Sequence, residues 1–539
     1  MSTLPYQSSK NANTSVLLQI DNDGETTHRL CAMMNTTRAL VVLTALPASA
    51  LAADLTLDKI DGAKPVNIVY ILSDDHRYDV MSFLGHPWVE TPAMDAMAKE
   101  GVYFRNAVVT TSLCSPSRAS ILTGQYMHNH GVVDNNVLTP KGTVFFPQYL
   151  QAAGYQTGYF GKWHMGGHSD APRPGFDKWV SFRGQGHYYP PKGRKWSLNI
   201  DGKSVPQKGY ITDELTDYAL EWLAGPVKKS GKPFFVYLSH KGVHGMFHPA
   251  KRHAGRYKDK PLPIPNTMAN TPANYKDKPM WLKNQRNSWH GVDFAYHQAT
   301  DIAEHYRLYC EALLSVDDSI ARVRQWLKEN DLADNTLVFY MGDNGFQWGE
   351  HGLIDKRTAY QASMRVPLLG VCPSRWKAGQ TVDQVVANID IGPTILEAAG
   401  LKTPSQMDGR SFHQLATVGA KPSEWRPNLL YEYYWEYSYP HTPTTFALLT
   451  QRFKFIQYHG LWDIDELYDL QEDPHEEHNL IFEKDHQQRI TRMRAELHNI
   501  LVDANANRVP FSHKRRMGSN LRRKSGSKPA EFPPQLIRE

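Results

Sequence analysis

The stretch "VNIVYILSDD", residues 66–75, does most to decide the expected fold. Its run of β-branched and other apolar residues is typical of a strand that is buried inside a sheet. Two carboxylates, Asp74 and Asp75, follow the run directly. A buried strand that ends on charged residues indicates an α/β protein, in which ligands bind at the carboxyl ends of the strands.

Three other stretches repeat this apolar run with a polar end: "QTGYFGKWH" (156–164), "KPFFVYLSHK" (232–241) and "NTLVFYMGDNG" (335–345). Residues 103–110 and 366–373 are also predicted as strands. Helices are predicted at residues 91–101, 115–122, 146–155, 212–225, 303–328 and 389–400. This alternation predicts an α/β fold with a large, mixed, mostly parallel sheet between helices. The polar residues at the strand ends, His240 among them, are expected to meet at one edge of that sheet.

The pattern changes after about residue 405. Residues 427–437, 445–460 and 465–474 are predicted as short antiparallel strands, and residues 487–504 as a closing helix. The expected organisation is a main domain at 65–404, a smaller α+β subdomain with a short antiparallel sheet at 405–510, and a tail at 511–539. Residues 249–300, rich in Pro, Asn, Lys and Trp, are predicted as a long loop that is functional or disordered.

The first 52 residues are predicted to be an upstream extension followed by a signal peptide at about residues 33–52. Arg38 precedes an apolar run at 39–46, and small residues end the segment before Ala53. This run is too short to span a membrane. The pattern favours a secreted or periplasmic protein that starts at Met33 or Met34, with a cytosolic protein that has a disordered leader as the alternative.

The net charge of +5 is concentrated near one end of the chain. Residues 512–539 hold eight Lys/Arg and two Asp/Glu, a net +6, so the remaining chain is near −1. Nucleic-acid binding by the folded part is therefore not indicated. The tail is predicted to be a solvated terminus or, alternatively, a contact for an anionic polymer or membrane surface. The four cysteines, at 31, 114, 310 and 372, match neither a zinc signature nor a disulfide framework.

Two strand ends carry oxygen donors suited to a metal ion. Asp74 and Asp75 repel each other without a cation, and Asp343 and Asn344 add two further oxygens of the kind that Ca²⁺ or Mg²⁺ prefers. One such pair alone could equally cap a helix, but two pairs favour a metal site. Basic residues occur nearby in the motifs "GKWH", "SHKGVHGMFH" and "GEHGLIDKR", which indicates a site for an anionic group. Lys162 and His164 are expected to share one face of their strand.

The segment "SLCSPSRASILTG", residues 112–124, resembles the signature of type I, formylglycine-dependent sulfatases, through Cys114, Pro116, Ser117 and Arg118 and the Leu-Thr-Gly that follows. The resemblance covers about residues 65–510 and includes the two metal-ligand pairs, "GKWH", "SHKGVH" and Lys356. Bacterial polysaccharide sulfatases are especially similar. The resemblance implies an alkaline-phosphatase-like fold and a catalytic domain at 65–404. Gln125 departs from the pattern, since many relatives carry a basic residue there.

The resemblance also implies a set of roles. A formylglycine-generating maturation enzyme would oxidise Cys114, and the hydrated aldehyde would be the nucleophile. Ca²⁺, rather than Mg²⁺, would be bound by Asp74, Asp75, Asp343, Asn344 and residue 114. Arg118 and Lys162 would hold the diol and the sulfate, and His164 would accept the proton that triggers sulfate release. His244 and Lys356 would bind sulfate and protonate the leaving alkoxide, with His240 as a rival to His244.

The expected substrate is a sulfated carbohydrate, either an algal polysaccharide such as ulvan or a glycosaminoglycan-type oligosaccharide. One alternative is a phosphonate or phosphate monoester hydrolase that shares the Cys-x-Pro-x-Arg motif. Another is a non-catalytic polysaccharide-binding protein. For Cys114 itself, the alternatives are a thiol nucleophile activated by a helix N-terminus and a small buried apolar residue.

Overall fold

A computed structural model describes residues 55–506, except 167–168, 289, 294–300, 418–424, 437–438 and 460–462. The predicted signal peptide and the predicted basic tail lie outside these residues. The described part belongs to one compact unit that begins at Leu55, so the predicted boundary at 404–405 stays a prediction. None of the helices in the described ranges is long and apolar enough to cross a membrane.

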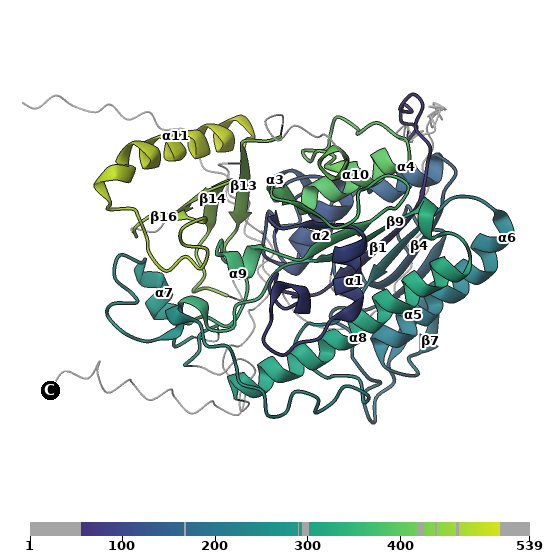
Figure 1. The fold of residues 1–539 in the computed structure, drawn as a ribbon, viewed down its shortest axis with the longest axis horizontal. Coiled ribbons are helices and arrows are strands. Elements are labelled where there is room, and N and C mark those ends of the chain that lie inside the picture. The colour runs from purple at the N-terminus through teal and green to yellow at the C-terminus, as the bar shows by residue number, and fades with distance from the viewer. Residues whose placement is uncertain are drawn as a thin grey trace, which may run out of the picture. The chain divides into compact units, whose positions relative to one another are not determined.

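A ten-stranded sheet with strand order β11-β2-β10-β9-β1-β8-β4-β5-β6-β7 forms the centre of this unit (Figure 1). The strands are β1 (Asn67–Ser73), β2 (Val102–Phe104), β4 (Gln156–Lys162), β5 (Lys178–Phe182), β6 (Ser197–Ile200), β7 (Lys203–Pro206), β8 (Phe234–Ser239), β9 (Thr336–Gly342), β10 (Leu368–Val371) and β11 (Gln380–Val382). The five strands β9-β1-β8-β4-β5 run parallel, whereas β10, β6 and β7 pair antiparallel with their neighbours. The predicted mixed, mostly parallel sheet is confirmed.

Helices cover both faces of the sheet because alternate residues of the central strand are apolar on both sides. Ile68 and Tyr70 of β1 pack in one core with α2 (Cys114–Thr123), α4 (Phe146–Ala152) and α10 (Ile391–Ala398). Val69 and Ile71 pack in a second core with α1 (Pro92–Glu100), α5 (Ile211–Trp222) and α8 (Ile302–Glu329). The two sets of helices lie on opposite sides of the strands in Figure 1.

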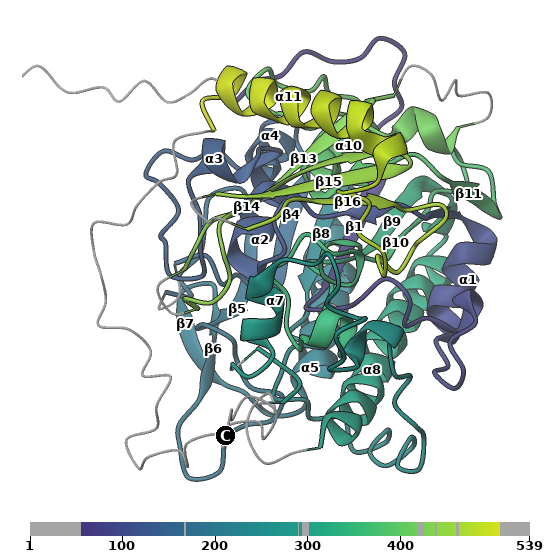
Figure 2. The ribbon, with the colours of Figure 1, turned by 90° about the vertical axis from the view of Figure 1, so that its left-hand side faces the viewer.

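A four-stranded antiparallel sheet follows, as predicted for the C-terminal part. It consists of β13 (Asn428–Tyr433), β14 (Thr445–Thr450), β15 (Phe453–Tyr458) and β16 (Glu466–Asp469). Helix α11 (Gln487–Asp503) lies along this sheet and shares a core with it through Leu497 and Leu448 (Figure 2). The backbone N–H of Glu432 in β13 donates to the carbonyl of Thr110 (2.9 Å), which ties this sheet to the loop that leads into α2.

Two local predictions need correction. Residues 103–110 form two short strands, β2 and β3 (Ala107–Val108), instead of one, and the two strands belong to different sheets. The chain turns at Arg105 and Asn106, where the Arg105 N–H and the Asn106 amide bind the carbonyls of Val382 (2.9 Å) and Asp383 (2.7 Å). The predicted loop at 249–300 contains the short helix α7 (Met280–Gln285) and is held in part by side chains of α8.

Candidate active site

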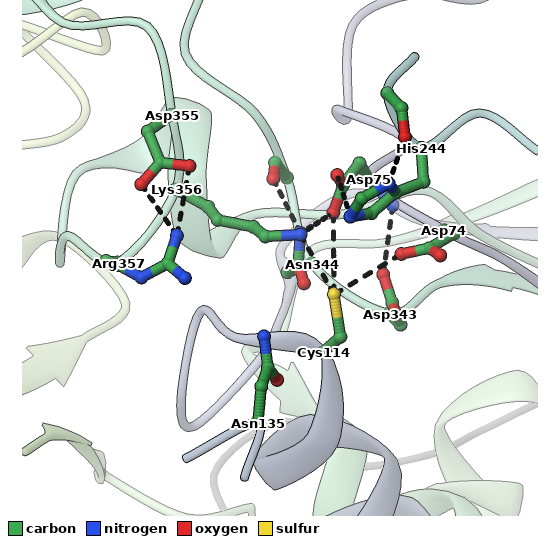
Figure 3. Close-up of polar contacts among 12 residues, drawn as sticks. Asp74, Asp75, Cys114, Asn135, His244, Asp343, Asn344, Asp355, Lys356 and Arg357 are labelled. Carbon is green, nitrogen blue, oxygen red and sulfur yellow. Dashed lines mark hydrogen bonds and ion pairs between the residues drawn. The ribbon is translucent and has the colours of Figure 1, made fainter. Parts of the chain in front are cut away.

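The carboxyl ends of β1 and β9 bring three carboxylates together (Figure 3). Asp74 and Asp75 follow β1, and Asp343 follows β9, which pairs with β1 in parallel. One oxygen of each carboxylate lies within 4.8 Å of the other two, and all three residues are buried. Asp343 Oδ1 accepts a hydrogen bond from the Asp75 backbone N–H (3.0 Å), and Asn344 Nδ2 donates to Asp75 Oδ1 (2.7 Å). Four of the five residues predicted as metal ligands are therefore adjacent.

Burial and neighbouring charges shift the pKa values of the three carboxylates in different directions. Burial and the charge of Asp74 raise the pKa of Asp343 to about 7, and burial raises the pKa of Asp75. Burial acts in the same direction on Asp74, but its positive neighbours, led by Lys162, lower the pKa of that carboxyl well below its usual value. The Asn344 Oδ1 atom is buried and accepts no hydrogen bond from the described residues. Three adjacent carboxylates and an amide oxygen without a donor among the described residues are hard oxygen ligands, which fit a dication such as Ca²⁺ or Mg²⁺.

Cys114 is the first residue of α2, and its side chain points toward the carboxylates that follow β1 and β9. Its Sγ lies 3.4 Å from Asp74 Oδ1 and 2.9 Å from Lys356 Nζ, and the side chain is fully buried. Burial and the charge of Asp74 raise the pKa of the Cys114 thiol to about 12. An unmodified thiol at this position is therefore protonated at neutral pH, which argues against a thiolate nucleophile.

Three cations surround the cluster. Arg118, one turn into α2, binds Asp343 Oδ2 through Nη2 (2.8 Å) and donates from Nη1 to the Lys162 carbonyl (2.8 Å). Lys162 forms an ion pair with Asp74, and Lys356 forms one with Asp75. Burial opposes the charge of Lys356, but Asp75 raises the pKa of that ammonium well above its usual value. The structure thus brings together all three of the predicted cationic residues.

The side chain of His164 is directed by a turn after the strand, and not by the alternation along the strand that was predicted. Strand β4 ends at Lys162, and His164 has a left-handed backbone (φ 59°), so the alternation of side chains along a strand does not apply to it. Its Nδ1 lies 3.2 Å from the hydroxyl of Ser115, the second residue of α2. Burial and the nearby charge of Lys162 lower the pKa of His164 well below its usual value, so the imidazole is neutral.

The structure separates the two rival histidines. His244 Nε2 lies 3.8 Å from Asp75 Oδ2, at the cluster. His240 Nε2 instead lies 3.0 Å from the hydroxyl of Ser319 on α8, and the ring does not join the cluster. The reason is the alternation along β8, because Ser239 accepts a hydrogen bond from Arg118 on the side of α2, and the next side chain faces α8. The structure therefore does not bring His240 together with the other predicted site residues.

Lys241 was not predicted as a site residue from the sequence, whereas Arg357 belongs to a basic motif that was predicted to face an anionic group. Lys241 is buried with its ammonium 4.7 Å from the centre of the Tyr188 ring, and burial and Lys162 lower its pKa to about 8. Beyond Lys356, Arg357 forms buried ion pairs with Asp355 (2.8 Å) and Glu436 (2.8 Å), and Figure 3 shows the Asp355–Arg357 pair beside Lys356. Glu436 lies 79 positions from Arg357, so spacing gave no signal for that pair, whereas Asp355 lies only two positions from Arg357.

Three of the nine described non-glycine residues with a left-handed backbone lie at the site. They are Asp75 (φ 62°), His164 (φ 59°) and Arg357 (φ 79°). Such conformations cost about 1–3 kcal/mol each and are concentrated at functional sites. Their coincidence with the buried charges indicates that the surrounding fold holds these side chains in position for chemistry.

Known proteins give an independent comparison. The sulfatase family model matches residues 66–401, and the model of the N-sulphoglucosamine sulphohydrolase C-terminal region matches residues 349–503. The N-acetylglucosamine-6-O-sulfatase of Bacteroides thetaiotaomicron is 32% identical over 495 residues, 81% of this chain and 86% of that protein. One solved structure contains a protein bound to that protein's own substrate, D-glucosamine-2-N,6-O-disulfate. It superposes on this chain with a TM-score of 0.74 at 29% identity, over 83% of this chain and 99% of that chain.

The phosphonate monoester hydrolase of Agrobacterium radiobacter shares the fold, with a TM-score of 0.66 at 21% identity, over 82% of this chain and 96% of that chain. Three findings agree with the motif around Cys114. They are the sheet topology, the match of the sulfatase family model to more than half of the chain, and the 32% identity to the Bacteroides thetaiotaomicron sulfatase. The chain belongs to the sulfatase family, has the alkaline-phosphatase-like fold and is a sulfuric ester hydrolase.

Proposed function

We propose that this protein removes sulfate from a sulfated carbohydrate, with residue 114 converted to formylglycine and Ca²⁺ bound by the carboxylate cluster. One observation carries the proposal: Cys114 Sγ lies against both Asp74 (3.4 Å) and Lys356 (2.9 Å). A nucleophile at this position would face a dication and a cation at once, which is what attack on an anionic ester requires.

Asp74, Asp75, Asp343 and Asn344 would hold the Ca²⁺ ion together with residue 114. Ca²⁺ is favoured over Mg²⁺ because a buried set of protein oxygens suits an ion that gives up its water readily. When bound, Ca²⁺ would supply positive charge that stabilises the oxygens of the sulfate group and the ionised nucleophile. Together with Arg118, Lys162, Lys241 and Lys356, it would make the site net positive for an anionic substrate.

Hydrated formylglycine would supply two hydroxyls, one as the nucleophile toward sulfur and the other for the later release of sulfate. The protein side chains would carry the proton transfers. His164 is neutral because burial and Lys162 lower its pKa, so its imidazole can accept the proton of the second hydroxyl. The ammonium of Lys356 can hold a sulfate oxygen and assist the leaving alkoxide.

His244 is proposed as the main proton donor to that alkoxide. Burial and Lys162 lower the pKa of His244 in the protein alone, with Asp74 acting in the opposite direction. A sulfate group placed beside the ring adds negative charge, and a negative neighbour raises the pKa of an imidazole. The substrate itself would therefore promote the protonated form that the acid role needs.

The carbohydrate assignment is supported by the relatives, one of which is named for N-acetylglucosamine 6-sulfate and another of which was solved with a disulfated glucosamine. The protein would bind a sulfated carbohydrate as its substrate, and a formylglycine-generating enzyme would modify residue 114. The predicted signal peptide further supports a periplasmic or secreted location, which N-terminal sequencing of the exported protein would test.

Phosphonate or phosphate monoester hydrolysis is the second candidate, because the fold is shared with a phosphonate monoester hydrolase. Matched sulfate and phosphate monoesters of one sugar and one phenol separate the two candidates. We expect the aldehyde-bearing enzyme to release sulfate from 6-O-sulfated N-acetylglucosamine faster than phosphate from the corresponding phosphate ester. A clear preference for the phosphate esters would refute the proposal, as would sulfate release from aryl esters alone.

A further inference from the structure

The loop that follows β5, residues 183–196, begins at the same edge of the sheet as the catalytic cluster. Strand β5 pairs in parallel with β4, which pairs in parallel with β8, so the carboxyl ends of the three strands lie together. Tyr188 of this loop is 2% exposed, and its hydroxyl donates to the backbone carbonyl of His244 (2.9 Å). None of the roles proposed above uses this hydroxyl.

The backbone before His244 is fixed by the end of β1. The Val243 N–H donates to the carbonyl of Asp74 (2.7 Å), one residue beyond that strand. After His244 the chain comes to the surface, where Met246 is 56% exposed. The hydrogen bond from Tyr188 therefore holds the chain where it leaves the support of the sheet.

The ring of His244 is oriented by the residue that follows it. Its Nδ1 lies 2.5 Å from the carbonyl oxygen of Gly245. Because a carbonyl can only accept, Nδ1–H is the donor, and Nε2 is the nitrogen that faces Asp75 (3.8 Å, Figure 3). The Tyr188 hydroxyl binds the peptide that joins His244 to Gly245, so it helps to set the position of the carbonyl that orients the ring.

Tyr188 is itself held on several sides. Its carbonyl accepts a hydrogen bond from the Ile211 N–H (2.9 Å), and its ring stacks on that of Tyr210 with 5.7 Å between the centroids. The ammonium of Lys241 lies 4.7 Å from the centre of the same ring. A hydroxyl on a ring that is already ordered can restrain His244 at little cost in entropy.

Two other tyrosine hydroxyls bind carbonyls farther along the same segment. Tyr210 donates to His248 (3.0 Å), and Tyr189 donates to Pro249 (3.2 Å). All three tyrosines thus stabilise the segment after β8. Of the three, Tyr188 is the one that binds the residue proposed as the proton donor.

We propose that Tyr188 is a positioning residue for His244, whose hydroxyl keeps Nε2 directed at the leaving oxygen of the substrate. The inference rests on the proposed function, which makes His244 the proton donor. A sugar alkoxide needs that proton to leave, whereas a nitrophenolate leaves without it. The positioning role therefore predicts a loss confined to substrates with a poor leaving group.

The test compares Tyr188→Phe and Tyr210→Phe in the aldehyde-bearing enzyme, on 6-O-sulfated N-acetylglucosamine and on nitrophenyl sulfate. Tyr188→Phe keeps the ring beside Lys241 and removes the hydroxyl alone. It should lower kcat on the sugar sulfate by about three- to tenfold, the usual effect of one hydrogen bond, with KM unchanged. Nitrophenyl sulfate should react at the wild-type rate. Tyr210→Phe, the matched control that removes the bond to His248, should equal the wild type on both substrates.

Combination with His244→Ala decides whether the effect passes through His244. In that background, Tyr188→Phe should lower kcat on the sugar sulfate no further. An undiminished effect in the double variant would overturn the inference, as would equal losses on both substrates. A Tyr188→Phe enzyme that equals the wild type would also overturn it, and would leave the ring beside Lys241 as the only role of Tyr188.

Nuclear magnetic resonance of the histidine rings separates this inference from the proposed function, because it needs no turnover. In protein labelled at histidine, the ring signals of His244 are those that His244→Ala lacks. Tyr188→Phe should shift these signals, and Tyr210→Phe should not. Such a shift in protein that releases no sulfate would support the positioning of His244 and overturn only the proposed function. Unshifted signals in Tyr188→Phe would overturn the inference.

Discussion

Replacement of Asp343 by Asn tests the metal site in the most controlled way. The change keeps the shape of the side chain but removes one of three carboxylates that share the cluster. At a hundredfold excess over its dissociation constant, a ligand stabilises the folded state by about 2.7 kcal/mol. We expect Ca²⁺ to raise the melting temperature of the wild-type protein, and EDTA to lower both melting temperature and sulfate release. Asp343→Asn should lose the Ca²⁺ response and the activity.

The variant also disturbs the ion pair with Arg118 (2.8 Å), and loss of a buried pair costs about 3–5 kcal/mol by itself. Asp390→Asn is the matched control, because Asp390 is equally buried and is paired with Arg426 away from the cluster. This control should lose stability but keep the full Ca²⁺-dependent shift, read by calorimetry with and without EDTA. If Asp343→Asn kept the Ca²⁺-dependent shift in melting temperature, or if EDTA left the wild-type protein unchanged, the carboxylate cluster would not be the Ca²⁺ site.

Two further predictions concern histidines. His244→Ala should lose about 10²- to 10⁴-fold in kcat/KM on a carbohydrate sulfate but far less on an aryl sulfate, whose phenol leaves without a proton, whereas His240→Ala should show a smaller and unselective loss. Equal losses on both substrates would exclude His244 as the acid. Burial lowers the pKa of His128, but the hydrogen bond to Glu432 (2.9 Å) raises it by more. The pKa of His128 therefore lies above the usual value near 6.5. The stabilising effect of this hydrogen bond is therefore full at about pH 5.5 and lost as the pH rises through the raised pKa. The melting temperatures of wild type and His128→Gln should converge toward about pH 9, and a gap that is constant with pH would contradict this.

Much of the fold could be predicted because the parallel strands are buried on both faces and therefore read as apolar runs. The strand of residues 66–75 and its polar end illustrate this, since β1 is fully buried and both aspartates lie at the cluster. Strands β6 and β7 were not predicted, because they form a half-exposed edge hairpin with little apolar signal. Pairing across the sheet is a non-local property that short windows do not contain.

The site was predictable where a motif names the residues, as for Cys114 and Arg118. His164 shows where local reasoning fails: the strand ends two residues earlier, and a left-handed turn decides the direction of the ring. The Arg357–Glu436 pair joins residues 79 positions apart and depends on how the C-terminal sheet packs, so no spacing rule could find it. The two histidines of "SHKGVH" could be separated only once β8 had a defined register.

The chemical state of residue 114 decides whether an aldehyde is the nucleophile. Mass spectrometry of the tryptic peptide 106–118 distinguishes the thiol from the aldehyde, because replacement of CH₂–SH by CHO lowers the mass. Protein made with and without a formylglycine-generating enzyme gives samples with different aldehyde fractions and, by circular dichroism, the same fold. We expect sulfate release to rise in proportion to the aldehyde fraction and Cys114→Ala to be inactive. Full activity in protein that carries only the thiol would contradict this expectation.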